Sequence, residues 1–186
     1  MKIKLQCIPN LLTFSRLILI IPILICIYKK QYSLTFYLFL TAGLTDTLDG
    51  WIARNFNWQS SYGASLDPLA DKFLITLSFI ALALIKILPW WLVILTILKD
   101  TTILLGIIIW FYIIKNKLIL KSIIISKINT TLQLLLIIFC LFNLAFHTIF
   151  NCIINIIILL TALTTTISNI TYIWIWILDT YQTILK

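Results

Sequence analysis

Four of the six acidic residues in this chain lie in one short stretch, between residues 46 and 71. Asp46 and Asp49 are three residues apart, and Asp67 and Asp71 are four residues apart. Offsets of three and four residues place each pair on one face of its own helix. Two such helices joined by a short polar turn could direct four carboxylates at one point. That point would suit a hard divalent cation, which prefers oxygen ligands.

The four carboxylates need a cation, because without one they would repel one another and be driven to protonate. Two divalent ions about 3.5–4 Å apart can hold a phosphoryl group and stabilise both the attacking and the leaving oxygen. A carboxylate that is not fully committed to metal could then take a proton from an attacking hydroxyl. The spacing therefore predicts a divalent-metal site for phosphoryl chemistry and leaves the substrate open.

Small and cationic residues surround the aspartates. Gly50 and Ala53 lack bulk, so a flat or phosphorylated ligand could approach the helix backbone. Gly63 is expected in the polar turn, where it would take a left-handed conformation or allow close approach of the ligand. Arg54 suits a phosphate, and its alternative role is to reach the membrane interface. Pro68 is expected in the first turn of the following helix, where its missing N–H costs little.

The composition indicates an integral membrane protein. The 186 residues are 62% hydrophobic and 11% charged, with a mean hydropathy of +1.10. A soluble domain of this size could not bury so much apolar surface. The net charge of +8 favours anionic lipid or phosphate ligands and argues against nucleic acid as a partner. The four cysteines are scattered, without metal-site spacing, and are interpreted as small apolar side chains.

Six apolar stretches are long enough to cross a bilayer, which takes roughly 20 residues. We therefore predict an all-α integral membrane protein with six transmembrane helices, forming a single membrane domain over residues 1–186. A short interfacial N-terminal segment, residues 1–10, is expected to precede them. The predicted spans are residues 12–28, 34–54, 66–86, 91–114, 127–147 and 152–177.

The distribution of lysine and arginine predicts the orientation in the membrane. With the N-terminus inside, seven basic residues fall on the inner side and three on the outer side. This bias favours cytoplasmic termini and an aspartate cluster that faces the cytoplasm. The inner residues are Lys2, Lys4, Arg54, Lys115, Lys117, Lys121 and Lys186, and the outer ones are Lys29, Lys30 and Lys86.

The aspartate region resembles the complete signature of the CDP-alcohol phosphatidyltransferase family. The run Asp46-Thr-Leu-Asp49-Gly50-Trp-Ile-Ala53-Arg54 is followed by Gly63, Asp67 and Asp71 at the spacing of that family. The resemblance implies a six-helix membrane domain, usually a homodimer, that binds a CDP-linked lipid and two Mg²⁺ or Mn²⁺ ions. An acceptor hydroxyl then displaces CMP.

The resemblance also implies roles for individual residues. Asp71 would both ligate metal and act as the catalytic base, while the small residues would lie against the cytidine and its phosphates. The implied metal ligands are Asp46, Asp49, Asp67 and Asp71, and the implied nucleotide and phosphate contacts are Gly50, Ala53, Arg54 and Gly63.

Other segments resemble the phosphatidylglycerol and cardiolipin branch of this family. Residues 9–16 and 67–72 look like that branch, and residues 126–133 are similar to a segment of its cardiolipin synthases. The resemblance implies transfer of the phosphatidyl group of CDP-diacylglycerol to a glycerol-type hydroxyl, in the inner membrane of a bacterium.

Two acceptors stay open: phosphatidylglycerol, which would give cardiolipin, and glycerol 3-phosphate. Synthases that use glycerol 3-phosphate typically carry two arginines in the fourth helix, where this chain has Lys99 and Ile107. The missing arginine fork slightly favours phosphatidylglycerol, which carries a single charge. Lys99, Lys121 and Lys127 could nevertheless contribute to a basic pocket for the acceptor.

Lys99 and Asp100 are adjacent within an apolar stretch, where unpaired charges are costly. Sequence neighbours do not face each other on a helix, so each residue is expected to have its partner elsewhere. A structural ion pair is favoured over direct contact with the substrate.

A small cation transporter is the rival hypothesis from another class, since acidic residues within membrane helices also mark ion pathways. The placement of the aspartates around one turn, together with the glycines and Arg54, fits a nucleotide-phosphate site better.

Overall fold

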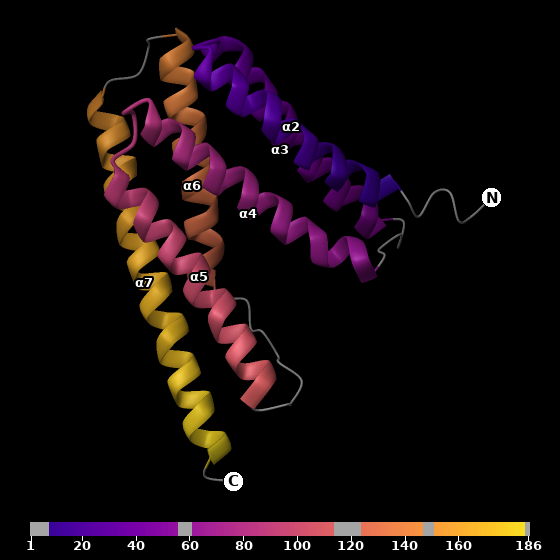
Figure 1. Cartoon of the computed structure of the whole chain (residues 1–186), viewed down its shortest axis with the longest axis vertical. Helices are drawn as coiled ribbons and strands as arrows, with labels where there is room; N and C mark the ends of the chain where they lie inside the picture. The colour runs from indigo at the N-terminus through magenta and orange to yellow at the C-terminus, as the bar shows by residue number, and fades with distance from the viewer. Residues whose placement is uncertain (1–7, 56–60, 114–123, 147–150, 185–186) are drawn as a thin grey trace, which may run out of the picture. The chain divides into compact units, whose positions relative to one another are not determined.

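The computed structural model describes residues 8–55, 61–113, 124–146 and 151–184, with side chains over 18–45, 71–106, 124–146 and 152–177. The described residues form six α-helices and no strand, which confirms the predicted all-α class (Figure 1). The helices are α2 (Ile8–Tyr28), α3 (Tyr32–Asn55), α4 (Ser61–Leu84), α5 (Trp90–Ile113), α6 (Ile124–Phe146) and α7 (Asn151–Ile184).

Each predicted span falls on one of these helices, and the helix ends differ by a few residues in most cases. α2 and α4 begin earlier than predicted, at Ile8 and Ser61, and α7 continues to Ile184. Residues 8–10, which were assigned to the interfacial segment, are therefore already helical. Residues 1–7 of that segment lie outside the described residues.

Two helical stretches among the described residues are long and apolar enough to cross a membrane, Ile124–Phe146 and Cys152–Ile177. A further apolar stretch, Ile18–Tyr28, is shorter. Large apolar side chains are also exposed on α2 and α4, for example Ile21 at 61% and Leu84 at 67%. Apolar exposure on this scale fits contact with lipid. The membrane character of the protein is supported, and six separate spans stay a prediction.

The chain divides into two compact units, and each unit combines two separate stretches of sequence. The first contains Met1–Leu88 and Ile137–Ile149, and the second contains Pro89–Leu136 and Phe150–Lys186. Helix α6 contributes its C-terminal part to the first unit and its N-terminal part to the second. The single membrane domain over residues 1–186 stays a prediction.

In the first unit, α2 packs against both α3 and α4 (Figure 1). α3 runs antiparallel to α2, whereas α4 runs parallel to it. Phe36 of α3 makes edge contacts with Phe142 and Phe146 of α6, with ring centroids 5.4 and 5.9 Å apart. Apolar side chains at most 2% exposed form the core of this unit: Ile23, Ile27, Phe39, Phe79 and Leu82.

In the second unit, α5 and α7 lie side by side and run in the same direction (Figure 1). Their close approach depends on Gly106 of α5, because a Cβ atom there would overlap the indole of Trp176 in α7. The Trp176 ring also packs against Tyr172, with the ring centroids 6.3 Å apart. The missing side chain at Gly106 therefore leaves the space that the indole fills.

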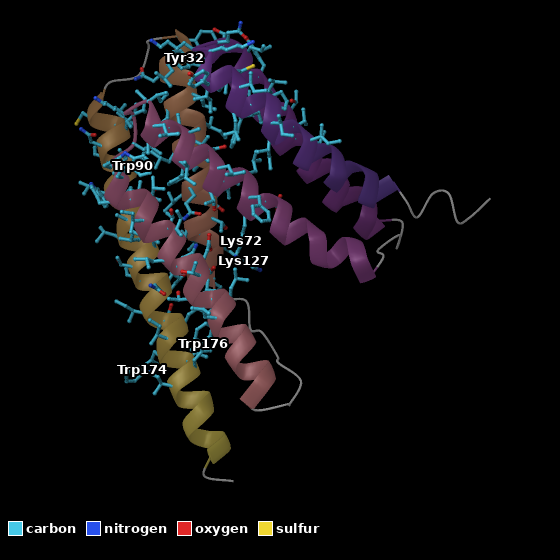
Figure 2. All side chains as sticks on the ribbon, in the orientation of Figure 1. Tyr32, Lys72, Trp90, Lys127, Trp174 and Trp176 are labelled. Atoms are coloured by element: carbon cyan, nitrogen blue, oxygen red, sulfur yellow. The ribbon has the colours of Figure 1, made fainter. Side chains whose placement is uncertain are left out.

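Tryptophans lie near both ends of the second unit. Trp90 begins α5, and Trp174 and Trp176 lie toward the C-terminal end of α7 (Figure 2). Trp90 and Trp174 are 50% and 63% exposed. Exposed indoles near helix ends are typical of the aromatic belts at membrane interfaces.

Replacing Gly106 by alanine tests the contact between α5 and α7. We expect Gly106→Ala to lower the free energy of unfolding by about 1–3 kcal/mol, because the Trp176 indole must shift from its packed position. Thermal unfolding in detergent measures the change. Gly43→Ala is the matched control, since a Cβ at Gly43 in α3 meets nothing within 4 Å. Equal melting temperatures for the two variants would contradict the packing described here.

Candidate functional site

The signature aspartates lie on two helices that are consecutive in the chain. Asp46 and Asp49 belong to the C-terminal half of α3, and Asp67 and Asp71 to the N-terminal half of α4. Only residues 56–60 separate the two helices, so Asn55 and Ser61 are at most about 22 Å apart. Helix α2 packs against both of these helices.

The backbone is helical at all four positions, as their spacing predicts. Asp71 is half-buried. The other predicted side chains of this site lie outside the described side chains, and their convergence stays a prediction. They are Asp46, Asp49, Asp67, Gly50, Ala53, Arg54 and Gly63.

The chemistry of the donor set fits a hard divalent metal. Carboxylate oxygens are the ligands that Mg²⁺ and Mn²⁺ prefer. Among the side chains that the structure describes, no group of three or more histidine, cysteine or acidic residues could hold a metal ion. The side chains of three of the four signature aspartates are not described, so Asp71 is the only signature aspartate among the described side chains.

Gly63 and Pro68 differ from expectation because α4 begins earlier than the apolar pattern indicates. Gly63 lies in the first turn of α4, so the left-handed turn conformation predicted for it is wrong, and close approach of a ligand is the role left open. Pro68 is the eighth residue of α4 rather than a first-turn residue. A proline there supplies no N–H for the carbonyl of Ala64, one helical turn earlier.

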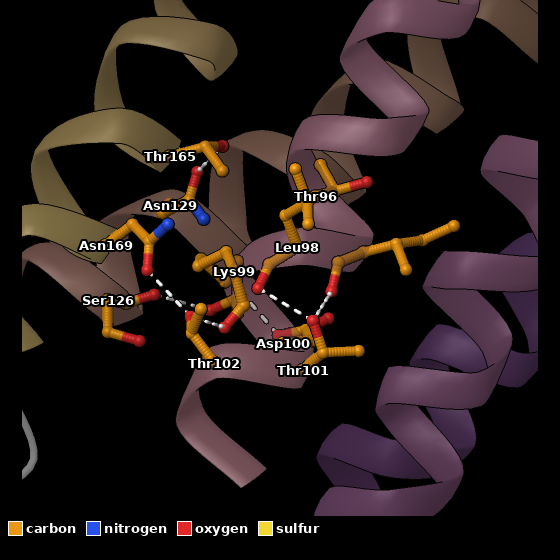
Figure 3. A network of polar contacts seen from close by, with 12 residues as sticks. Thr96, Leu98, Lys99, Asp100, Thr101, Thr102, Ser126, Asn129, Thr165 and Asn169 are labelled. Atoms are coloured by element: carbon orange, nitrogen blue, oxygen red, sulfur yellow. Dashed lines mark hydrogen bonds and ion pairs between the residues drawn. The ribbon is translucent and has the colours of Figure 1, made fainter. Parts of the chain in front are cut away.

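A second group of polar residues lies in the second unit and comes from α5, α6 and α7 (Figure 3). Its members on each helix are three or four residues apart, which places them on one helix face. We call this group the buried polar cluster. Seven side chains at most 4% exposed define it: Thr96, Lys99, Asn129, Gln133, Thr161, Thr165 and Ser168.

Lys99 is the cation of this cluster, and its ion pair differs from the predicted one. Lys99 Nζ lies 3.7 Å from Asp100 Oδ1, so the expectation that these sequence neighbours would not meet is wrong. The flexible four-carbon stem of lysine allows the ammonium group to turn toward the next residue. Asp100 therefore offsets part of the charge of Lys99 in a place where uncompensated charge is costly.

Hydrogen bonds connect α7 with both other helices of the cluster. The hydroxyls of Thr164 and Thr165 in α7 donate to Asn129 Oδ1 in α6, at 3.0 and 2.8 Å. The hydroxyl of Thr102 in α5 donates to Asn169 Oδ1 in α7, at 2.7 Å. The two bonds from α7 hold the Asn129 amide oxygen toward that helix (Figure 3).

Three buried polar atoms of the cluster have no hydrogen-bond partner among the described residues: Asn129 Nδ2, Gln133 Nε2 and Ser168 Oγ. Asn129 and Gln133 are four residues apart on α6, so two amide donors share one helix face. An unsatisfied buried donor costs about 1–3 kcal/mol. A ligand with oxygen acceptors would recover part of that cost, which makes the buried polar cluster a candidate binding site.

The other two lysines considered for the acceptor do not belong to this cluster. Lys127 is exposed in the first turn of α6, and Lys121 lies outside the described residues. Lys99 is therefore the member of the predicted basic set that the structure places among buried polar groups.

Sequence analysis did not point to the polar face of α7. Thr161, Thr165 and Ser168 recur at intervals of four and three residues within an apolar stretch. That helical period of hydroxyl groups is the signal that could have identified the face. Asn129 and Gln133 lie in the segment 126–133, which carried a resemblance but no assigned role.

The family model described as CDP-alcohol phosphatidyltransferase matches residues 6–177 of this chain. The chain therefore belongs to the CDP-alcohol phosphatidyltransferase family, which confirms the resemblance of its aspartate signature. Membership in this family does not support the alternative of a cation transporter.

The curated relatives carry two kinds of name. The cardiolipin synthase (CMP-forming) of Rattus norvegicus is 35% identical over 148 residues, which are 70% of this chain and 48% of the relative. The human protein of the same name is 34% identical over 148 residues, again 70% of this chain and 48% of the relative. A CDP-diacylglycerol–glycerol-3-phosphate 3-phosphatidyltransferase of Rickettsia typhi is 42% identical over 71 residues, 36% of this chain and 39% of the relative. The chain thus spans about half the length, or less, of these relatives.

A double-mutant cycle tests the contact between α6 and α7. We expect Asn129→Ala and Thr165→Val to show a coupling free energy of about 0.6 kcal/mol, and at most about 1.7, the range for hydrogen bonds between membrane helices. Unfolding of the single and double variants in detergent gives this value. Thr166→Val is the matched control: both hydroxyls have a carbonyl partner in their own helix, but the bonds of Thr166, to Ala162 and Leu163 at 3.1 and 2.8 Å, include none to Asn129. Equal coupling to Thr166 would contradict the specific contact.

Proposed function

We propose that this protein transfers the phosphatidyl group of CDP-diacylglycerol to the hydroxyl of phosphatidylglycerol, forming cardiolipin and releasing CMP. The observation that carries the proposal is the family match over residues 6–177, combined with a complete aspartate signature on two consecutive helices. The relatives named cardiolipin synthase (CMP-forming) align with 70% of this chain, at 35% and 34% identity.

In the proposed reaction, Asp71 takes the proton of the acceptor hydroxyl. At the same time the oxygen of that hydroxyl attacks the phosphorus of the phosphatidyl group. The bond between that phosphorus and the oxygen of CMP breaks, and CMP leaves with the bonding electrons. The attacking and leaving oxygens exchange on one phosphorus, so no oxidant or further reactant is needed.

The other signature residues bind the nucleotide end of the donor. Gly50, Ala53 and Gly63 leave room for the cytidine and its phosphates beside the helix backbone, and Arg54 provides a fixed cation for a phosphate. Two Mg²⁺ or Mn²⁺ ions, when bound, stabilise negative charge on the phosphoryl oxygens. The four carboxylates that would hold them are Asp46, Asp49, Asp67 and Asp71.

The charge of the buried polar cluster supports phosphatidylglycerol as the acceptor. A phosphomonoester such as glycerol 3-phosphate carries nearly two negative charges and needs several cations. Lys99 is paired with Asp100 at 3.7 Å, so the net positive charge of the cluster is small. The amide donors of Asn129 and Gln133 are neutral and suit a phosphodiester or glycerol oxygen. Glycerol 3-phosphate is the alternative acceptor, and the relative from Rickettsia typhi supports it.

The proposed setting is the inner membrane of a bacterium, with six spans in a single domain and the aspartates at the cytoplasmic boundary. The excess of lysine and arginine in the predicted inner loops supports this orientation. Within that membrane the protein is proposed to act as a homodimer, as the family resemblance implies.

The assignment of Asp71 as the base is tested by Asp71→Asn, which keeps the size of the side chain and removes its basicity. We expect CMP release from CDP-diacylglycerol to fall at least about 100-fold, the lower end of the contribution of a general base. Binding of the nucleotide substrate should persist in part. Asp49→Ala should abolish turnover by removing a metal ligand, and excess Mn²⁺ should not restore it.

Asp179→Asn is the matched control for this experiment, since Asp179 lies near the C-terminal end of α7 and outside the signature. It should leave the rate of CMP release unchanged. Turnover of Asp71→Asn at the rate of the unmodified protein would show that the base is another group.

The acceptor is identified by offering the purified protein CDP-diacylglycerol with either phosphatidylglycerol or glycerol 3-phosphate. We expect cardiolipin as the product, because the paired Lys99 leaves too little positive charge for a phosphomonoester. Mass spectrometry of the extracted lipids measures it. Lys99→Gln should raise the KM for the acceptor more than the KM for CDP-diacylglycerol. Formation of phosphatidylglycerophosphate alone would select the alternative acceptor.

A further inference from the structure

An apolar groove of about 270 Å³ lies between α2 and α4 in the first unit. Its volume is just below that of typical small-molecule pockets, about 300–1,000 Å³, and its walls are almost entirely hydrocarbon. Such a groove suits a flexible apolar chain better than a polar metabolite. Its lining includes Leu24, Ile27 and Tyr28 of α2 and Ala81, Leu84 and Ile85 at the end of α4.

Both helices that form the groove end in the same way. In α2 the N–H of Lys30 bonds to the carbonyl of Ile27 and the N–H of Gln31 to that of Cys26, at 3.0 and 2.9 Å. The end of α4 repeats the pattern, with the N–H of Lys86 bonded to the carbonyl of Ala83 at 2.9 Å. This closing motif normally places glycine in a left-handed conformation. Here lysine occupies that position twice.

The backbone angle φ is 58° at Lys30 and 63° at Lys86, a region that is costly for residues with a side chain. Lysine occupies this conformation at both helix ends although glycine would fit the backbone better. Glycine would end the helices as well, so helix termination alone does not explain the ammonium groups of Lys30 and Lys86.

Three lysines follow directly in sequence after residues that line the groove. Tyr28, which lines the groove, is followed by Lys29 and Lys30, and Ile85 is followed by Lys86. All three lysines are exposed, and none forms an ion pair with another residue that the structure describes. One end of an apolar groove thus carries three positive charges, which match the negative phosphate of a lipid.

We propose that this groove binds an anionic phospholipid, with one acyl chain between α2 and α4 and the phosphate at Lys29, Lys30 and Lys86. The charged end of the groove is separate from the aspartate site, because Leu84 lies about 20 Å along the α4 axis from Asp71, the nearer of the two signature aspartates on that helix. The lipid is therefore bound independently of the reaction proposed above, at the opposite ends of the helices.

A second copy of this chain fits the groove less well. A two-fold contact would bring the same surface patch of both copies together. The three lysines of one copy would then face those of the other, and like charges at such a contact oppose association. An anionic lipid instead neutralises the cluster.

The experiment uses the full chain in phosphatidylcholine vesicles with or without phosphatidylserine, in the presence of EDTA so that the aspartate site holds no divalent metal. Native mass spectrometry counts the phosphatidylserine molecules retained, and thermal unfolding measures their effect. We expect the unmodified protein to retain phosphatidylserine in preference to phosphatidylcholine and to unfold at a higher temperature with it.

The informative variant is Lys30→Gly/Lys86→Gly, which removes two charges and places the preferred residue at both left-handed positions. It should be at least as stable as the unmodified protein in phosphatidylcholine. Its affinity for phosphatidylserine should fall by about five-fold per lysine removed. Lys30→Arg/Lys86→Arg keeps the charges and should keep the affinity. Leu84→Trp fills the groove, leaves the lysines in place, and should also reduce lipid retention.

The proposal fails if Lys30→Gly/Lys86→Gly retains phosphatidylserine with unchanged affinity, since the lysines would then only end the helices. A change of oligomeric state in Leu84→Trp with unchanged lipid retention would assign the groove to a second copy and equally overturn it. Loss of catalytic activity plays no part in these readouts.

Discussion

Polar groups in this molecule must find their partners within the protein, because the helices present apolar side chains to their surroundings and no water is available within a bilayer. The threonines show how this is done. Thr45, Thr101 and Thr171 direct their hydroxyls to carbonyls three or four residues earlier in the same helix. Such local bonds satisfy a polar group without a tertiary partner. Exposed threonines are therefore compatible with a lipid-facing helix.

The same constraint explains the buried polar cluster. Side chains that cannot be satisfied locally have to be gathered where helices meet, so Asn129 takes hydrogen bonds from Thr164 and Thr165 of α7. Lys99 is tolerated at 1% exposure because Asp100 lies beside it. The exceptions are the amide nitrogens of Asn129 and Gln133 and the hydroxyl oxygen of Ser168, which lack partners among the described residues. An incompletely satisfied polar group inside an apolar protein is the pattern expected of a binding site.

Two groups of charges in the first unit lie toward helix ends, in keeping with this constraint. Lys30 and Lys86 lie just beyond α2 and α4, and the signature aspartates lie toward the other ends of α3 and α4. Within this unit the two ends of α4 therefore have opposite chemistry, one acidic and one basic, with an apolar groove beside the basic end. Cations are also favoured at helix C-termini by the helix dipole. Function is proposed at both ends, where charge and hydrocarbon meet.

Much of the fold could be predicted from the sequence, because apolar stretches of the right length determine helices without reference to their neighbours. Each predicted span coincides with a helix. The errors lie at helix ends: Gly63 and Pro68 are inside α4, since polar residues after Ser61 can continue a helix that apolar patterning alone does not detect. The pairing of Lys99 with Asp100 was also missed, because backbone spacing does not limit a long, flexible side chain.

The sequence by itself determined the helices, the register of the aspartates and the family, since all three depend on the spacing of residues along one chain. Only the tertiary structure decided which faces of α5, α6 and α7 share polar contacts, and that Gly106 makes room for Trp176. It also placed two left-handed lysines beside one apolar groove. The physical reason is that packing and burial depend on residues distant in the chain, whose proximity no local pattern encodes.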